Sequence, residues 1–245
     1  MRIAFLLALT ALVPSLPVHG ADRAETQAAG RQCVILLHGL GRTYRSMSKL
    51  AHAAESAGYI AVNLDYPSRA KAIETLAAEV VPEGLKRCRD AGASPVNFVT
   101  HSMGGIVVRY YLGKNRVPEL GRIVMLSPPN QGTEAADALR DDAFYRWWNG
   151  PAGQQLGTGA DGIAARLGPV TYPVGIITGT EHAFFDAERA KLIPGPNDGK
   201  VSVERAKVAG MTDLRIIPAT HTFIMNDDEA IFQALHFLRH ERFRW

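Results

Sequence analysis

Residues 96–105 constrain the fold more than any other part of this 245-residue chain. The stretch begins with residues that favour a buried strand, passes through a polar pair to Ser102, and continues with Met103, Gly104 and Gly105. Apolar residues then follow in the pattern of a buried helix. Small residues are needed where a strand and a helix pass too close for a side chain. We therefore predict a strand, a sharp turn with Ser102 at its tip, and a helix.

Short apolar runs alternate with helical patterns on both sides of this stretch. We predict further strands at 33–37, 59–64, 121–126, 172–178 and 214–217, and helices at 46–57, 70–88 and 227–240. The run at 33–37 has no alternation, which is typical of a strand covered on both faces. This alternation of strands and helices predicts an α/β fold with a mostly parallel sheet and helices on both faces. Within 70–88, Pro82 is expected to kink or divide the helix.

Length and charge narrow the class of protein. The residues from 31 to 245 suit a single α/β domain. The formal net charge of +3 is small for this length, and no basic run of the kind that follows phosphates is present, so nucleic acid is not an expected partner.

The first residues have the pattern of an export signal. Arg2 provides a positive charge, residues 3–13 form an apolar run, and small residues precede a cleavage site near Gly20. This run is too short to span a bilayer, so we predict a signal peptide at 1–20 and a periplasmic or secreted protein. Cys33 and Cys88 would then meet an oxidising compartment. Either a disulfide between them or two buried thiols fits the sequence.

The order Thr100, His101, Ser102, Met103, Gly104 resembles the Gly-x-Ser-x-Gly elbow of α/β-hydrolase lipases and esterases, with Thr100 in place of the first glycine. The resemblance implies that Ser102 is a nucleophile and that the backbone N–H of Met103 belongs to an oxyanion hole. A serine that only caps the following helix is the alternative.

A second resemblance follows the strand at 33–37. The sequence His38, Gly39, Leu40 is similar to the His-Gly-x loop of lipases, which implies that the Leu40 backbone N–H is the second oxyanion donor. His38 could be read as catalytic. As the first residue of the loop, it is expected to hold the loop by hydrogen bonding.

The same resemblance implies a base and an acid in the chain order Ser, acid, His. His221 follows the last predicted strand, where the base must lie, and His182 is the rival. Asp198 lies in a segment similar to the Asp-Gly-x-Val segment of related hydrolases, and Asp186 is the alternative orienter. The expected triad is Ser102, Asp198 and His221.

The strand–helix rhythm is lost at about 133–169, where we expect a small helical cap with short helices at 135–139 and 143–148 and a loose glycine-rich run at 150–162. Trp147 and Trp148, with two more aromatic residues just before them, are candidates for lining a substrate cleft. Aromatic residues that only anchor the insertion to the core are an equal alternative.

The resemblance implies an exported serine hydrolase that cleaves carboxylic esters through an acyl-enzyme, with no cofactor and no metal. Its expected partner is a small ester or lipid, with transient contact to a lipid surface. A triad is equally compatible with thioester, amide or acyl-transfer chemistry. A non-catalytic lipid-binding or chaperone-like protein on the same fold is the hypothesis from another class.

Overall fold

The computed structural model describes residues 31–245, which fold around one six-stranded sheet. The predicted signal peptide at 1–20 lies outside the described residues. The strands are β1 (Cys33–Leu37), β2 (Ile60–Leu64), β3 (Val96–His101), β4 (Leu120–Leu126), β5 (Val174–Glu181) and β6 (Asp213–Thr220). They lie in the order β2-β1-β3-β4-β5-β6, and every neighbouring pair is parallel.

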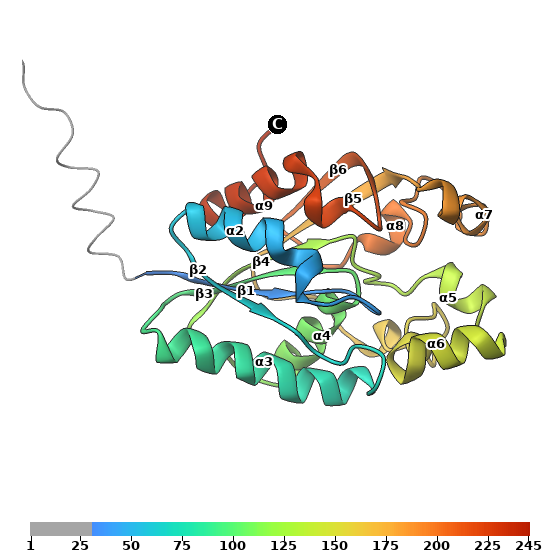
Figure 1. The fold of residues 1–245 in the computed structure, drawn as a ribbon, viewed down its shortest axis with the longest axis horizontal. Coiled ribbons are helices and arrows are strands. Elements are labelled where there is room, and N and C mark those ends of the chain that lie inside the picture. The colour runs from blue at the N-terminus through green and yellow to red at the C-terminus, as the bar shows by residue number, and fades with distance from the viewer. Residues whose placement is uncertain (1–30) are drawn as a thin grey trace, which may run out of the picture. The chain divides into compact units, whose positions relative to one another are not determined.

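Helices cover both faces of this sheet (Figure 1). One face carries α2 (Ser48–Ser56) and α9 (Asp228–His240), and the other carries α3 (Ile73–Asp90) and α4 (Met103–Leu112). Along β1, Val34 and Leu36 join the core on the α2 and α9 side, whereas Ile35 and Leu37 join the core on the α3 and α4 side. An uninterrupted apolar strand is what burial on both faces requires. The predicted fold class is confirmed.

Smaller elements lie beyond the carboxyl ends of the strands (Figure 1). After β4 come α5 (Glu134–Ala138), α6 (Ala143–Gln154) and η2 (Ala164–Arg166). Between β5 and β6 lie η3 (Phe184–Asp186), α7 (Ala187–Ala190) and α8 (Val203–Ala206). The short elements η1 (Tyr44–Met47) and η4 (Ile224–Asn226) precede α2 and α9. These additions surround the edge of the sheet where an open α/β fold binds its ligands.

Three local expectations need correction. Pro82 lies inside the continuous helix α3 and does not divide it. Helix α6 breaks near the predicted end, at Gly150, whose φ of 62° and close approach to the Arg69 backbone admit no side chain, but a second helical segment follows up to Gln154 where a loose run is expected. Strand β6 continues through Pro218, which a strand at the edge of a sheet tolerates because it lacks one neighbour to bond.

Cys33 and Cys88 form a disulfide, with their Cα atoms 5.8 Å apart. Cys33 begins β1 and Cys88 lies near the end of α3, at the opposite edge of the sheet from Ser102. Both residues are fully buried. The bridge therefore joins the first strand to a helix of its covering layer, far from the carboxyl ends of the strands.

Removing this bridge should lower the free energy of unfolding by about 4 kcal/mol on the chain-entropy model, because the cysteines are 55 residues apart. Urea denaturation of the Cys33→Ala/Cys88→Ala variant measures the loss. Reductant should shift the wild-type midpoint towards that of the variant and leave the variant unchanged. Equal midpoints for oxidised wild type and variant would contradict the prediction.

Candidate active site

Ser102 occupies the turn between β3 and α4, with φ 53° and ψ −125°. A non-glycine residue in this region is strained, and such strain persists only where the surroundings enforce it. Here the helix packs closely on β1, because a Cβ on Gly104 would lie 2.7 Å from the Leu37 carbonyl oxygen. The predicted strand, turn and helix are present, and the turn holds the Ser102 side chain at the sheet edge.

Thr100 fits at the position where the related elbow has glycine because Gly105 lies opposite it. A Cβ on Gly105 would lie 3.2 Å from the Thr100 Oγ1 and 3.2 Å from the Met125 Sδ. The second glycine of the pair thus leaves room for the threonine side chain, which is fully buried.

His221 lies between Ser102 and Asp198. Its Nε2 is 3.0 Å from the Ser102 Oγ, and its Nδ1 is 2.9 Å from the Asp198 Oδ2. A carboxylate at Nδ1 favours the tautomer that carries its proton there, which leaves Nε2 to accept the serine proton. All three residues are buried, with Ser102 the most exposed at 9%. The structure brings together the three side chains that the sequence analysis singled out.

Asp198 is held by its own loop. Its Oδ1 accepts the backbone N–H groups of Lys200 and Val201, and its carbonyl oxygen accepts the His221 N–H at 3.0 Å. Burial alone would raise the pKa of this carboxyl, but the His221 ring and the Val201 N–H outweigh burial and hold the pKa below its usual value. Asp198 is therefore an ionised acceptor fixed in both position and charge.

The alternative candidates for the acid and the base, and His38, make other contacts. Asp186 accepts the Thr222 hydroxyl at 3.2 Å and makes no hydrogen bond to His221 among the contacts of residues 31–245. His182 is exposed and does not line the cavity beside Ser102.

His38 holds its loop by hydrogen bonding, as expected. Its Nδ1 donates to the Gly39 carbonyl, its Nε2 accepts the Tyr66 N–H, and its ring stacks on Tyr66. Burial lowers the pKa of His38, so its ring is neutral.

Two backbone N–H groups, those of Leu40 and Met103, are candidates for an oxyanion hole beside Ser102. Leu40 and Ser102 line one cavity, and Met103 follows Ser102 as the first residue of α4. Within the described part of the chain, neither the Leu40 N–H nor the Met103 N–H donates a hydrogen bond. Gly39, next to Leu40, packs against the elbow so closely that a Cβ there would lie 3.1 Å from the Ser102 Cβ. Both N–H groups are thus available to a negatively charged oxygen.

His101 holds the backbone of His221 through a contact that sequence reasoning missed. Its Nε2 donates to the His221 carbonyl oxygen at 3.0 Å, so the His221 backbone is held at both its N–H and its C=O. Burial, followed by the nearby His221, puts the pKa of His101 well below its ordinary value. The signal available in the sequence was only a histidine beside the serine; its partner is 120 residues away.

This neutral histidine predicts acid sensitivity. Above about pH 6.5 His101 is neutral in both states, and below it the unfolded chain takes up a proton that the folded protein does not, so stability is lost as the pH falls. The maximum contribution is about 1.4 kcal/mol per pH unit. Urea denaturation between pH 7 and pH 5 should show a shallower loss for His101→Gln than for wild type. Identical slopes would contradict the assignment.

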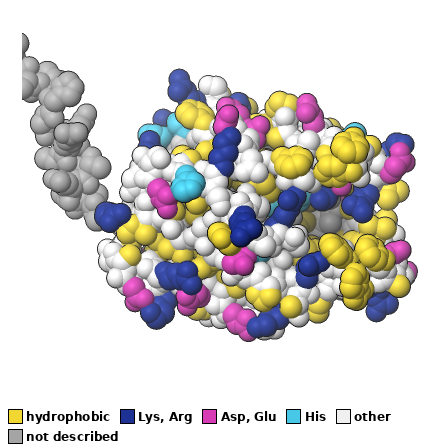
Figure 2. Space-filling view, in the orientation of Figure 1, with side chains coloured by type: hydrophobic (Ala, Val, Ile, Leu, Met, Phe, Trp, Pro, Cys, Tyr) yellow, Lys and Arg dark blue, Asp and Glu magenta, His cyan; other side chains and the backbone are white. Residues whose placement is uncertain are grey.

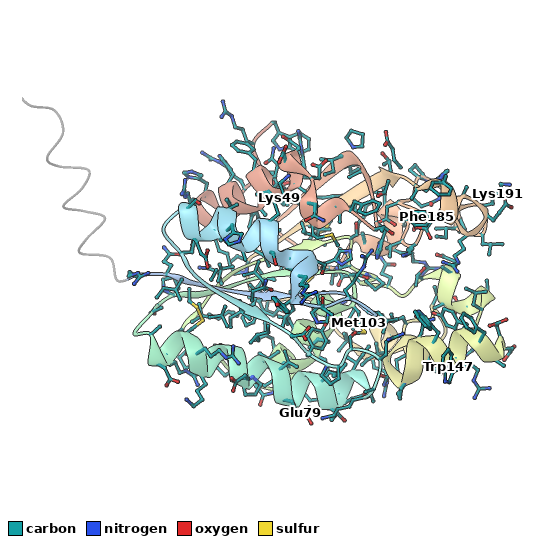
Figure 3. The ribbon with its side chains drawn as sticks, in the orientation of Figure 1. Lys49, Glu79, Met103, Trp147, Phe185 and Lys191 are labelled. Carbon is teal, nitrogen blue, oxygen red and sulfur yellow. A yellow bond between two sulfur atoms is a disulfide. The ribbon has the colours of Figure 1, made fainter. Side chains whose placement is uncertain are left out.

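The cavity beside Ser102 has a volume of about 560 Å³. Cap residues form its apolar side: Ala135, Ala136, Leu139, Phe144, Tyr145, Trp148 and Leu156. Trp148 stacks under the Arg69 guanidinium at 4.5 Å. The expectation that Trp147, on α6 (Figure 3), also lines the cleft needs correction, because its side chain is 73% exposed and is not among the residues that line the cavity. Adjacent helical residues face different directions, so only one of the two reaches the site.

No group of three or more potential metal-ligating side chains is found among residues 31–245. In the same residues, no helix is both long enough and apolar enough to cross a bilayer.

Comparison with known proteins establishes the family. The alpha/beta hydrolase family matches residues 34–242, and the chain belongs to it. No curated protein sequence matches the chain.

Solved structures of low sequence identity share the fold. The mature lipase BlEst2 from Bacillus licheniformis is 19% identical, with a TM-score of 0.70 over 85% of this chain and 92% of that one. The phospholipase PlaB from Legionella pneumophila is 18% identical, with a TM-score of 0.68 over 87% of this chain and 60% of that one. A metagenomic carboxyl esterase is 17% identical, with a TM-score of 0.65 over 87% and 75%.

Proposed function

We propose that this alpha/beta hydrolase is a serine hydrolase that cleaves carboxylic esters. The observation that carries the proposal is the hydrogen-bonded chain from Ser102 through His221 to Asp198, beside a cavity that has an apolar side formed by the cap. A serine hydroxyl is a weak nucleophile, and a base oriented by a carboxylate is the arrangement that activates it.

In the proposed reaction, His221 Nε2 takes the Ser102 proton as the oxygen attacks the ester carbonyl. The negative charge that forms on the carbonyl oxygen is stabilised by the Leu40 and Met103 N–H groups. Each of these donors lowers the activation barrier by roughly 3–4 kcal/mol. His221 then protonates the leaving alcohol, and the acyl group stays on Ser102. Water repeats the cycle and releases the acid, while Asp198 stabilises the charged imidazole throughout.

The apolar cap side of the cavity supports an acyl group as the part of the substrate that it holds. The solved structures that share the fold include a lipase, a phospholipase and a carboxyl esterase, and this supports esters over amides as the first substrates to test. The triad geometry itself is shared with thioester hydrolysis and acyl transfer.

Turnover of p-nitrophenyl esters from acetate to palmitate tests the proposal. We expect hydrolysis well above the buffer rate, with a chain-length optimum set by the cavity beside the cap. Rates equal to buffer for every ester would contradict ester hydrolysis and favour a binding protein that retains the fold.

We also propose that the protein is exported to the periplasm or secreted. The signal-like pattern at 1–20 and the Cys33–Cys88 disulfide support this proposal, because disulfides persist in oxidising compartments. Fractionation of cells that express the full chain should place the mature protein outside the cytoplasm. Retention of an uncleaved chain in the cytoplasm would contradict export.

A further inference from the structure

The cavity beside Ser102 has two chemically different sides. The cap provides the apolar side, whereas Arg42, Arg189 and Lys200 line the other side. These three residues, here called the cationic wall, come from the loop after β1, from α7 and from the segment after Asp198. On the face shown in Figure 2, Lys and Arg side chains lie around a hollow that has hydrophobic groups above and below it.

Hydrogen bonds to Thr222 and ion pairs with Asp186 hold the side chains of the cationic wall in place. The Arg42 Nη2 donates to the Thr222 carbonyl oxygen at 3.1 Å, and the Lys200 Nζ donates to the Thr222 Oγ1 at 3.3 Å. Asp186 lies beneath, with its carboxylate 3.9 Å from the Lys200 Nζ and 3.5 Å from the Arg189 Nη1. The buried aspartate that does not orient His221 thus organises the cations instead.

Three cations line this side of the cavity, whereas Asp142 on the cap is the only carboxylate in the lining among the described residues. Behind the lining, Asp186 pairs with Arg189 and Lys200, and the carboxylate of Asp198 is engaged by His221. Burial lowers the pKa of Lys200; Asp186 is the strongest effect that opposes this shift, and the nearby Arg42 and Arg189 add to the lowering. Like charges brought together in a half-buried cavity are costly, and a bound anion relieves that cost.

In the proposed reaction, the alcohol is expected to leave on the side of His221, and the wall is attached to the residue that follows His221. Thr222, which holds two of the cations, directly follows His221, the residue that protonates the leaving alcohol in the proposed reaction. The acyl group is expected on the opposite, apolar side. An anionic group on the alcohol part of an ester would therefore meet Arg42 and Lys200.

We propose that the cationic wall binds an anionic group on the alcohol portion of the substrate, so that the preferred substrates are acyl esters of phosphorylated or carboxylated alcohols. This inference rests on the proposed ester hydrolysis. Arginine and lysine bind phosphate and carboxylate by charge-assisted hydrogen bonds, and each such bond is expected to change kcat/KM by about tenfold or more.

The test uses butyryl esters that share one acyl group and stay in solution. Release of butyrate is measured from 1-butyrylglycerol, from 1-butyrylglycerol 3-phosphate and from the carboxylate ester O-butyrylglycolate, with O-butyrylglycolamide as its neutral partner. We expect kcat/KM at least about tenfold higher for one or both anionic esters than for the neutral partner, mainly through a lower KM. A preference for phosphate or for carboxylate identifies the natural group, and either supports the proposal.

Variants locate the effect. Arg189→Gln changes an exposed side chain and so tests the wall without disturbing the core, whereas Arg42→Gln and Lys200→Gln change more buried positions. Each should reduce the ratio of anionic to neutral kcat/KM by about tenfold. Lys191→Gln is the matched control, because Lys191 points outward at the end of α7, pairs with Glu188 and does not line the cavity (Figure 3).

The failures are distinguishable. Equal kcat/KM for anionic and neutral esters in the wild type would overturn the anion proposal and leave ester hydrolysis intact. An anionic preference that survives all three substitutions in the wall would overturn the assignment to these residues. No hydrolysis of any ester, including p-nitrophenyl butyrate, would overturn the proposed function itself.

Discussion

Replacing Ser102 with alanine should reduce kcat for p-nitrophenyl butyrate by about 10⁶-fold, the loss seen when a serine hydrolase loses its nucleophile. The physical reason is that the Ser102 Oγ is the one hydroxyl hydrogen-bonded to His221 Nε2 among residues 31–245. The residual rate over buffer should come from the backbone donors and from binding alone.

Ser56→Ala is the matched control, because Ser56 is an exposed serine at the end of α2, outside the cavity. Circular dichroism should show that both variants are folded. A Ser102→Ala variant that keeps wild-type kcat would assign the reaction to another group and contradict the account.

Replacing Asp198 with asparagine should reduce kcat by about 10⁴-fold, because an amide at this position favours the wrong tautomer of His221. The side chain keeps its size and can still accept the backbone N–H groups of Lys200 and Val201, so folding should be retained. Steady-state kinetics on p-nitrophenyl butyrate at neutral pH measure the effect.

Asp186→Asn provides the comparison within the same loop region. Asp186 is equally buried but contacts Thr222 and the cationic wall rather than His221, so its loss should cost far less on this neutral ester. A larger loss for Asp186→Asn than for Asp198→Asn would make Asp186 the orienting acid and reverse the assignment.

The sheet and the elbow could be predicted from sequence because their signals are local. The unbroken apolar run at β1, the glycine pair after Ser102 and the alternation of strands with helices each fix one piece of structure within a few residues. The resemblance to lipases and esterases groups Ser102, Asp198 and His221, and these residues meet because parallel strands bring their carboxyl ends to one edge of the sheet.

Other features depend on contacts between distant segments. Residues 150–162 read as a loose run in the sequence, yet a second helical segment follows Gly150, whose non-helical backbone packs on Arg69. Trp147 and Trp148 are adjacent residues of the same type, so the sequence cannot distinguish them. The orientation of α6 decides which one lines the cavity.

The cationic wall could not be predicted for the same reason. Arg42 and Lys200 are far apart in the chain, and they meet only because both side chains are bound to Thr222. The long segment between β5 and β6 shows no regular pattern in the sequence, although it supplies Asp186, Arg189, Asp198 and Lys200 to one side of the site.

Covalent labelling tests the central claim most directly. The full chain would be treated with a fluorophosphonate, digested and analysed by mass spectrometry, with heat-denatured protein as the control. The account predicts one phosphonyl adduct per chain, on Ser102, that is lost in the denatured control. An unlabelled native protein, or an adduct on a different serine, would contradict it.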